Sequence, residues 1–133
     1  MADTHTLLRL RRAGILLGIL VLSFATLVPG GPIETRDFSG LDGSVFWGFN
    51  AFLVALGLVA VTSAVALLKG ADRFVWPAIA ACWGYIFVVL LDLGGVFPRS
   101  PDVIPVALGV VEILDLMLAF YVLVLCHRAL EHF

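Results

Sequence analysis

Charged residues are scarce in this chain: only 14% of its 133 residues are Asp, Glu, Lys or Arg, whereas soluble globular domains carry about 25%. Hydrophobic residues make up 62% of the chain, and its mean hydropathy is +1.10. The formal net charge is −2, so there is no basic surplus with which to bind nucleic acid. This composition excludes an ordinary soluble domain and predicts an integral membrane protein without a nucleic-acid partner.

The residues that most enzymes and cofactor sites require are also few. The two cysteines, Cys82 and Cys126, form no CxxC motif and lie in apolar segments. The three histidines, His5, His127 and His132, lie near the ends of the chain, where none can ligate a haem inside a bilayer. No HExxH, GxSxG or GK[ST] motif is present. We therefore expect no enzymatic activity, no cofactor and no metal site.

Four apolar segments dominate the chain, at about 13–28, 45–68, 74–97 and 103–126. A spanning helix needs roughly 20 apolar residues, so four such helices with short connections use nearly the whole chain. We predict an all-α integral membrane protein, a four-transmembrane-helix bundle that forms a single membrane domain over 1–133. Its only long connection is an outer loop at 29–44. Asp42 or Ser44 is expected to cap the second helix, and Asp102 the fourth.

The basic residues predict the orientation of these helices. Three arginines precede the first segment, Lys69 and Arg73 separate the second from the third, and Arg128 follows the fourth. If four helices cross, these six cations share one side and only Arg36 and Arg99 lie on the other. The positive-inside rule then places the N- and C-termini in the cytoplasm. This split and the lack of an organelle presequence favour a bacterial inner (plasma) membrane.

The first segment has a second interpretation. Its basic start, its short apolar stretch and the small-x-small sequence at 23–25 also resemble a cleavable signal peptide, which would leave three helices. Gly14 and Gly18, however, form a small-xxx-small pair that suits a retained packing helix. Similar pairs recur and are expected to serve mainly packing within the chain: Ala51 with Ala55, Ala60 with Ala64, and Ala80 with Gly84.

Three acidic residues, Asp92, Glu112 and Asp115, lie inside the apolar segments. A carboxylate in hydrocarbon requires a partner, a proton or a water-filled cavity. Glu112 and Asp115 are three residues apart and share one helix face. The short link between the third and fourth segments makes them antiparallel neighbours, which brings Asp92 towards Glu112. Asn50 lies at a depth comparable with Asp92, and Arg36 in the outer loop is the natural counter-charge.

The same acidic residues also have a structural interpretation. Asp92 can lie in the headgroup zone, and Glu112 with Asp115 can hold helices together through hydrogen bonds worth about 0.6–2 kcal/mol each. In the functional interpretation, the three residues bind a proton, a cation or a ligand beneath the outer loop. The sequence leaves both interpretations open.

Three functions fit these features. The first, which the small size and the missing motifs favour, is an accessory, structural or binding subunit of a membrane complex. The second is a small oligomeric transporter or channel in which Glu112 and Asp115 bind protons or cations. The third is a lipid- or quinone-binding protein. The expected partners are membrane lipids and either a second copy in a homodimer or a larger membrane complex.

Overall fold

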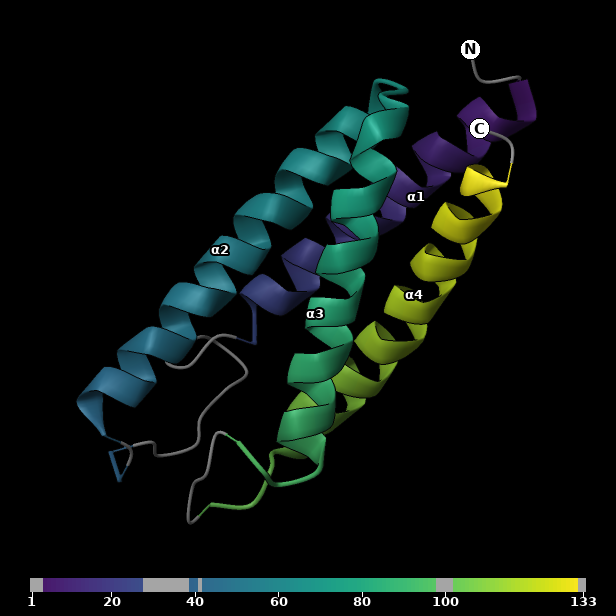
Figure 1. Ribbon diagram of the computed structural model, residues 1–133. Helices are drawn as coiled ribbons and strands as arrows, with labels where there is room; N and C mark the ends of the chain where they lie inside the picture. The colour runs from purple at the N-terminus through teal and green to yellow at the C-terminus, as the bar shows by residue number, and fades with distance from the viewer. Residues whose placement is uncertain (1–3, 28–38, 41, 98–101, 132–133) are drawn as a thin grey trace.

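The computed structural model describes residues 4–27, 39–40, 42–97 and 102–131, and this part of the chain contains four α-helices and no strand. The elements are α1 (Thr4–Ala25), α2 (Gly43–Leu68), the 3-10 turn η1 (Asp72–Phe74), α3 (Val75–Leu93) and α4 (Val106–Leu130). α1 packs on α2, α2 on α3, α3 on α4, and α4 on α1. The helices therefore form a ring around one apolar core, with both chain termini at the same end (Figure 1).

Three of the helices are long and apolar enough to cross a membrane: α2, η1 with α3, and α4. They mark the chain as a membrane-embedded protein. α1 is not among them, because Arg9, Arg11 and Arg12 lie within the helix and leave only the stretch from Ala13 to Ala25 free of charge.

Several helix ends differ from the sequence prediction. α1 begins at Thr4 rather than near residue 13, because arginine and leucine sustain a helix well and Thr6 and Leu10 face the core. α3 ends at Leu93 rather than near residue 97. Gly95 has a φ of +70°, the left-handed conformation that terminates helices. α4 runs over 106–130 rather than 103–126.

Of the two predicted helix caps, one is confirmed and one is wrong. Asp42 caps α2, since its carboxylate accepts hydrogen bonds from the Ser44 hydroxyl at 2.6 Å and the Ser44 backbone N–H at 2.8 Å. Both hydrogen bonds, chiefly the one from the Ser44 hydroxyl, hold the pKa of Asp42 below its ordinary value. The prediction that Asp102 caps α4 is wrong, because the cap position is Pro105 and no side-chain hydrogen bond caps the helix there. Most of the loop at 29–44 lies outside the described residues.

α1 and α2 come close enough for their backbones to touch at Gly14. A Cβ atom at Gly14 would lie 2.8 Å from the carbonyl oxygen of Ala64 and 3.0 Å from the nitrogen of Leu68, whereas a Cβ at Gly18 would meet nothing within 4 Å. Of the predicted glycine pair, only Gly14 therefore lies at the helix crossing. Ala60 is buried on the same side of α2 as Ala64, which fits their predicted use in internal packing.

Other small residues of α2 do not pack inside the chain. Ala51 and Ala55, expected mainly to pack internally, are both exposed. Gly48 and Thr62 on the same helix are exposed as well. The small residues of α2 thus lie on two faces, one turned to the core and one turned outwards.

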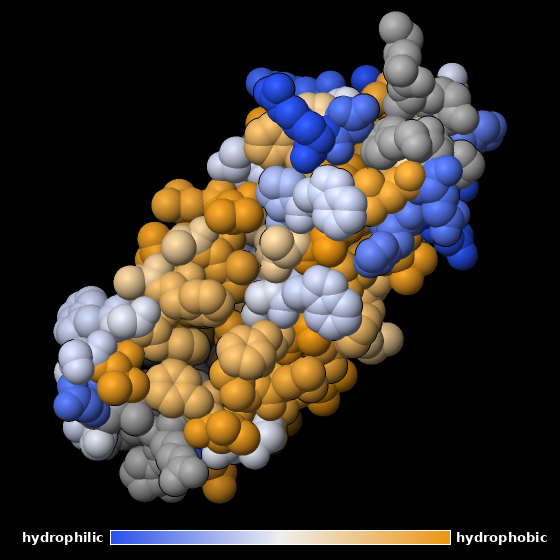
Figure 2. Space-filling view, in the orientation of Figure 1, coloured by the Kyte–Doolittle hydropathy of each residue, from blue (hydrophilic) through white to orange (hydrophobic). Residues whose placement is uncertain are grey.

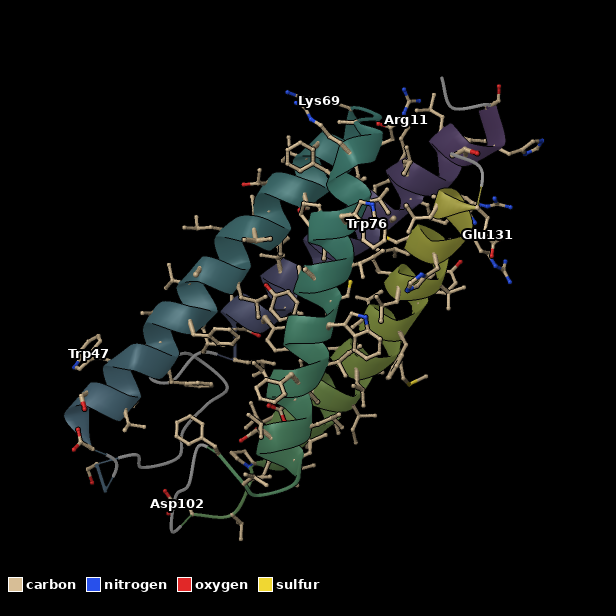
Figure 3. The ribbon with its side chains drawn as sticks, viewed as in Figure 1. Arg11, Trp47, Lys69, Trp76, Asp102 and Glu131 are labelled. Atoms are coloured by element: carbon tan, nitrogen blue, oxygen red, sulfur yellow. The ribbon has the colours of Figure 1, made fainter. Side chains whose placement is uncertain are left out.

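The two ends of the molecule differ in charge. All the Lys and Arg residues of the described segments gather where the termini lie, which we call the basic end: Arg9, Arg11, Arg12, Lys69, Arg73 and Arg128. Figure 2 shows hydrophilic surface at this end and apolar surface along the middle of the molecule. Trp47 and Asp102 lie at the opposite end, the far end (Figure 3).

Candidate functional site

All three intramembrane acidic residues are enclosed by the protein. Asp92, Glu112 and Asp115 are 3%, 5% and 3% exposed. Asp92 lies in the last turn of α3, and the other two lie in the first half of α4, nearer the far end. Because α3 packs on α4, these helices place the three carboxyl groups in the interior of the ring rather than on its lipid-facing surface.

Asp115 has a hydrogen-bond partner on the first helix. The Ser23 hydroxyl donates to Oδ2 of Asp115 at 2.8 Å, across 92 residues of sequence. This bond joins α1 directly to α4 in a partly buried setting. From the sequence alone, Ser23 is only part of a possible cleavage site. One signal pointed to it: Ser23 is the only hydroxyl-bearing residue between Ala13 and Ala25.

The residue after Ser23 anchors the same end of α1 to a third helix. The ring of Phe24 packs against the ring of Tyr85 on α3, with centroids 4.2 Å apart. Ser23 and Phe24 therefore connect the last turn of α1 to α4 and α3 at once.

The Ser23 bond fixes how far α1 extends alongside α4. At a rise of about 1.5 Å per residue, α1 continues only about 3 Å past Ser23, while α4 continues about 13 Å beyond Asp115 towards the far end. Figure 1 shows α1 stopping short of the far ends of its neighbours. Glu112, about 4.5 Å further along α4 than Asp115, consequently lies near the level at which α1 ends.

The remaining predicted site residues contribute differently. Asn50 is half-buried in α2, and its amide nitrogen donates to the carbonyl oxygen of Phe46 in the same helix at 2.8 Å. That nitrogen therefore serves the backbone of α2. Arg36, the predicted counter-charge, lies outside the described residues, as does Arg99.

The chemistry available at this site is that of carboxyl groups and a hydroxyl group away from water. A buried carboxyl group can take up or release a proton, and as a carboxylate it can hold a cation. Within residues 4–27, 42–97 and 102–131, no three His, Cys, Asp or Glu side chains gather closely enough to hold a metal ion.

These features define a membrane-embedded, all-helical protein with carboxyl groups in its core. The chain belongs to the family described as "Domain of unknown function (DUF8051)", whose profile matches residues 10–132. The match begins inside α1 and includes Ser23 and all three acidic residues. No curated protein and no solved structure gave a match.

Proposed function

We propose that this protein is a non-catalytic, four-span membrane protein that serves as an accessory subunit of a larger membrane complex. One observation carries the proposal: a row of small residues is exposed on the outside of α2. We call it the small-residue stripe, and it consists of Gly48, Ala51, Ala55 and Thr62.

The stripe is turned away from the core of this chain. At 3.6 residues per turn, it is centred roughly 130° around α2 from the side chains that α2 buries. Exposed bulky residues border it, Phe52 at 44% and Leu58 at 65% exposure. Small side chains do not improve contact with lipid tails. They do improve contact with a second helix, because small residues let two backbones approach closely. The stripe therefore suits a helix of another subunit.

The interior position of the acidic residues also favours this function. Glu112 and Asp115 are enclosed by their own chain, and Asp115 accepts a hydrogen bond from Ser23. A partner that docks on α2 does not require access to them. In this proposal the acidic residues hold the subunit together, and the outer surface of α2 binds the partner.

The four-span topology is supported by the position of α1 and by the charges. α1 packs in the ring beside α2 and α4 although its first turns are basic, which favours a retained helix over a cleaved signal peptide. Four crossings return the chain to the side on which it started, in agreement with both termini lying at the basic end. The positive-inside rule assigns this end to the cytoplasm, and we propose a bacterial inner membrane as the location.

The first test identifies the proteins that co-purify with the full chain at native expression level in native nanodiscs. We expect a stoichiometric larger partner, and we expect the double substitution Ala51→Leu with Ala55→Leu to remove it by filling the stripe. The matched control is Ala80→Leu with Ala107→Leu, which makes the same changes at exposed positions of α3 and α4. Retention of the partner by both variants contradicts docking through the stripe. A homo-oligomer without any other protein contradicts the accessory function itself.

The burial of three carboxyl groups in one chain supports a second candidate, a small oligomeric transporter or channel. Ionisable residues inside a membrane protein commonly mark proton or cation pathways. If the protein is such a transporter or channel, we expect Glu112→Gln and Asp115→Asn each to abolish proton or cation flux into proteoliposomes, although both variants insert normally. Asp102→Asn, a change of the same kind at an exposed acidic residue of the far end, keeps the flux. Unchanged flux in the two core variants rejects this candidate.

A further inference from the structure

Four ring-bearing side chains lie on the outer surface of α3 and α4, between the middle of these helices and the basic end. We call them the ring cluster: Trp76 and Trp83 on α3, and Phe120 and His127 on α4. All four are exposed, Trp76 to 64%, Trp83 to 52% and Phe120 to 46%. The ring cluster is separate from the small-residue stripe, which belongs to α2.

One ring contact fixes how α3 and α4 lie against each other here. The rings of Trp83 and Phe120 meet edge to face, with centroids 6.4 Å apart. The two helices are antiparallel neighbours, and seven residues make almost two full turns. A step of seven residues towards the basic end therefore leads from Trp83 to Trp76 on α3 and from Phe120 to His127 on α4. Trp76 and His127 consequently face each other across the line between the helices, and Figure 3 shows Trp76 on the side of α3 that is turned to α4.

The surface between the two ring pairs is apolar. Ile79 lies between the two tryptophans on the same face of α3, and Leu123 lies between Phe120 and His127 on α4. Ile79 is 7% exposed and Leu123 is 4% exposed, so both lie beneath the rings. α3 and α4 separate towards the basic end (Figure 1). The ring cluster therefore surrounds an apolar floor that widens in this direction.

Two members of the ring cluster have hydrogen-bonding groups that the described part of the chain does not use. The indole N–H of Trp83 donates, and the imidazole of His127 donates or accepts, but neither side chain forms a hydrogen bond with any described residue. At a rise of about 1.5 Å per residue, Trp83 lies about 12 Å from the start of α3 and about 15 Å from its end. No water serves an N–H group at this depth, so a bound molecule with an acceptor atom satisfies it.

The spacing of these two groups limits the size of such a molecule. His127 lies about 10.5 Å beyond the level of Phe120, and therefore of Trp83, at seven residues along the helix. Two hydrogen bonds of about 2.9 Å leave roughly 5 Å between the two acceptor atoms. A flat carbon ring with a carbonyl oxygen at each end has this span. A second helix fits less well, because bulky rings keep two backbones apart.

We propose that the ring cluster binds an isoprenoid quinone. The quinone ring lies over Ile79 and Leu123, and His127 and Trp83 donate hydrogen bonds to its two carbonyl oxygens. The isoprenoid tail follows the apolar outer surface away from the basic end (Figure 2), past Phe87, which is 58% exposed on the same face of α3. The proposal concerns binding alone and does not depend on a partner at α2.

Tryptophan fluorescence tests this site, because quinones quench it on contact. The full chain in phosphatidylcholine nanodiscs is titrated with a short-tailed ubiquinone. One variant keeps only Trp83 (Trp47→Phe with Trp76→Phe), and the other keeps only Trp47 (Trp76→Phe with Trp83→Phe). We expect saturable quenching of Trp83, and only a linear, collisional loss at Trp47, which is 71% exposed at the far end. Linear quenching of both tryptophans overturns the proposal.

A further substitution in the variant that keeps only Trp83 tests the hydrogen bond from α4. His127→Phe keeps a ring and removes the donor, so the affinity should fall about fivefold, the contribution of one ordinary hydrogen bond. The matched control, Tyr121→Phe, removes a hydroxyl group from an exposed residue of α4 that points about 100° away from Phe120. It should leave the affinity unchanged. An equal loss in both variants, or no loss with His127→Phe, overturns the site.

Two competition experiments test other occupants of the ring cluster. An excess of an isoprenoid alcohol, which has the tail but no quinone ring, should leave the quenching of Trp83 in place. Full relief by the alcohol shows that the rings hold any apolar chain, and this outcome rejects a quinone site. Complete protection of Trp83 by a co-purified subunit assigns the ring cluster to a protein interface and rejects it as well.

Discussion

The closest approach of two helices in this protein predicts a sharp difference between two glycines of α1. Gly14 and Gly18 are four residues apart in the same helix. A methyl group at Gly14 would lie 2.8 Å from the carbonyl oxygen of Ala64 and 3.0 Å from the nitrogen of Leu68, and both are backbone atoms of α2 that cannot rotate away. A methyl group at Gly18 would meet nothing within 4 Å. The substitutions Gly14→Ala and Gly18→Ala therefore form a matched pair.

The expected free energies follow from two opposing effects. Alanine stabilises a helix by about 1 kcal/mol relative to glycine, and this gain applies equally at both positions. At Gly18 nothing opposes it, so the free energy of unfolding should rise by up to about 1 kcal/mol. At Gly14 the two helices must separate, and overpacking of this kind costs about 1–3 kcal/mol. The two variants should therefore differ in stability by about 1–3 kcal/mol, with Gly14→Ala the less stable.

Thiol reactivity gives a direct assay of this difference. Cys82 and Cys126 are 0% and 1% exposed, so a thiol reagent reaches them only when the ring of helices opens. The modification rate is measured in mixed micelles with an increasing fraction of denaturing detergent, and the midpoints of the variants are compared. If Gly14→Ala and Gly18→Ala are equally stable, or if Gly14→Ala is more stable than the unmodified chain, then the α1–α2 contact is not where the structure places it.

Two further predictions concern hydrogen bonds, one between α1 and α4 and one at the exposed start of α2. A double-mutant cycle of Ser23→Ala and Asp115→Asn, measured with the same thiol assay, should show a coupling energy of about 0.6–2 kcal/mol; additive effects would mean that the two side chains do not interact. The Asp42 cap should protect the amide of Ser44 from hydrogen exchange, relative to Asp42→Ala. Because the pKa of Asp42 is lower in the folded state, this protection is complete above the unfolded value of about 3.9 and is lost as the pH falls through the lower folded value. Protection that persists in the fully protonated state would exclude the carboxylate as the cap.

Hydropathy identified the apolar segments but not the ends of the helices. It reports which residues prefer hydrocarbon, whereas a helix ends where the backbone conformation changes. The arginines at the start of α1 were therefore placed before the helix, although the helix continues through them because Thr6 and Leu10 still face the core. In the same way, apolar residues after Gly95 extended the third segment, although the positive φ of this glycine had already ended α3.

The candidate site was predictable as a set of acidic residues but not as a set of contacts. Asp92, Glu112 and Asp115 were singled out because carboxyl groups are costly in hydrocarbon, and all three are buried. The partner of Asp115 could not be inferred, because it is 92 residues away and depends on how α1 and α4 are rotated about their axes. Asn50 was assigned to the site by depth alone, yet its amide nitrogen binds the backbone of its own helix.

The Ser23–Asp115 bond also separates assembly from function within the acidic group. Asp115 holds the last turn of α1, so its neutralisation perturbs the ring as well as any bound proton or cation. Glu112 lies one turn further out on the same face of α4, and Glu112→Gln leaves the Ser23 bond in place. Ser23→Ala does the reverse: it removes the tie to α1 and keeps all three carboxyl groups. If Glu112→Gln abolishes flux and Ser23→Ala does not, the carboxyl chemistry itself is the function. If neither changes flux while Ser23→Ala releases the co-purified subunit, the acidic residues act only by holding the helices in the arrangement that the partner recognises.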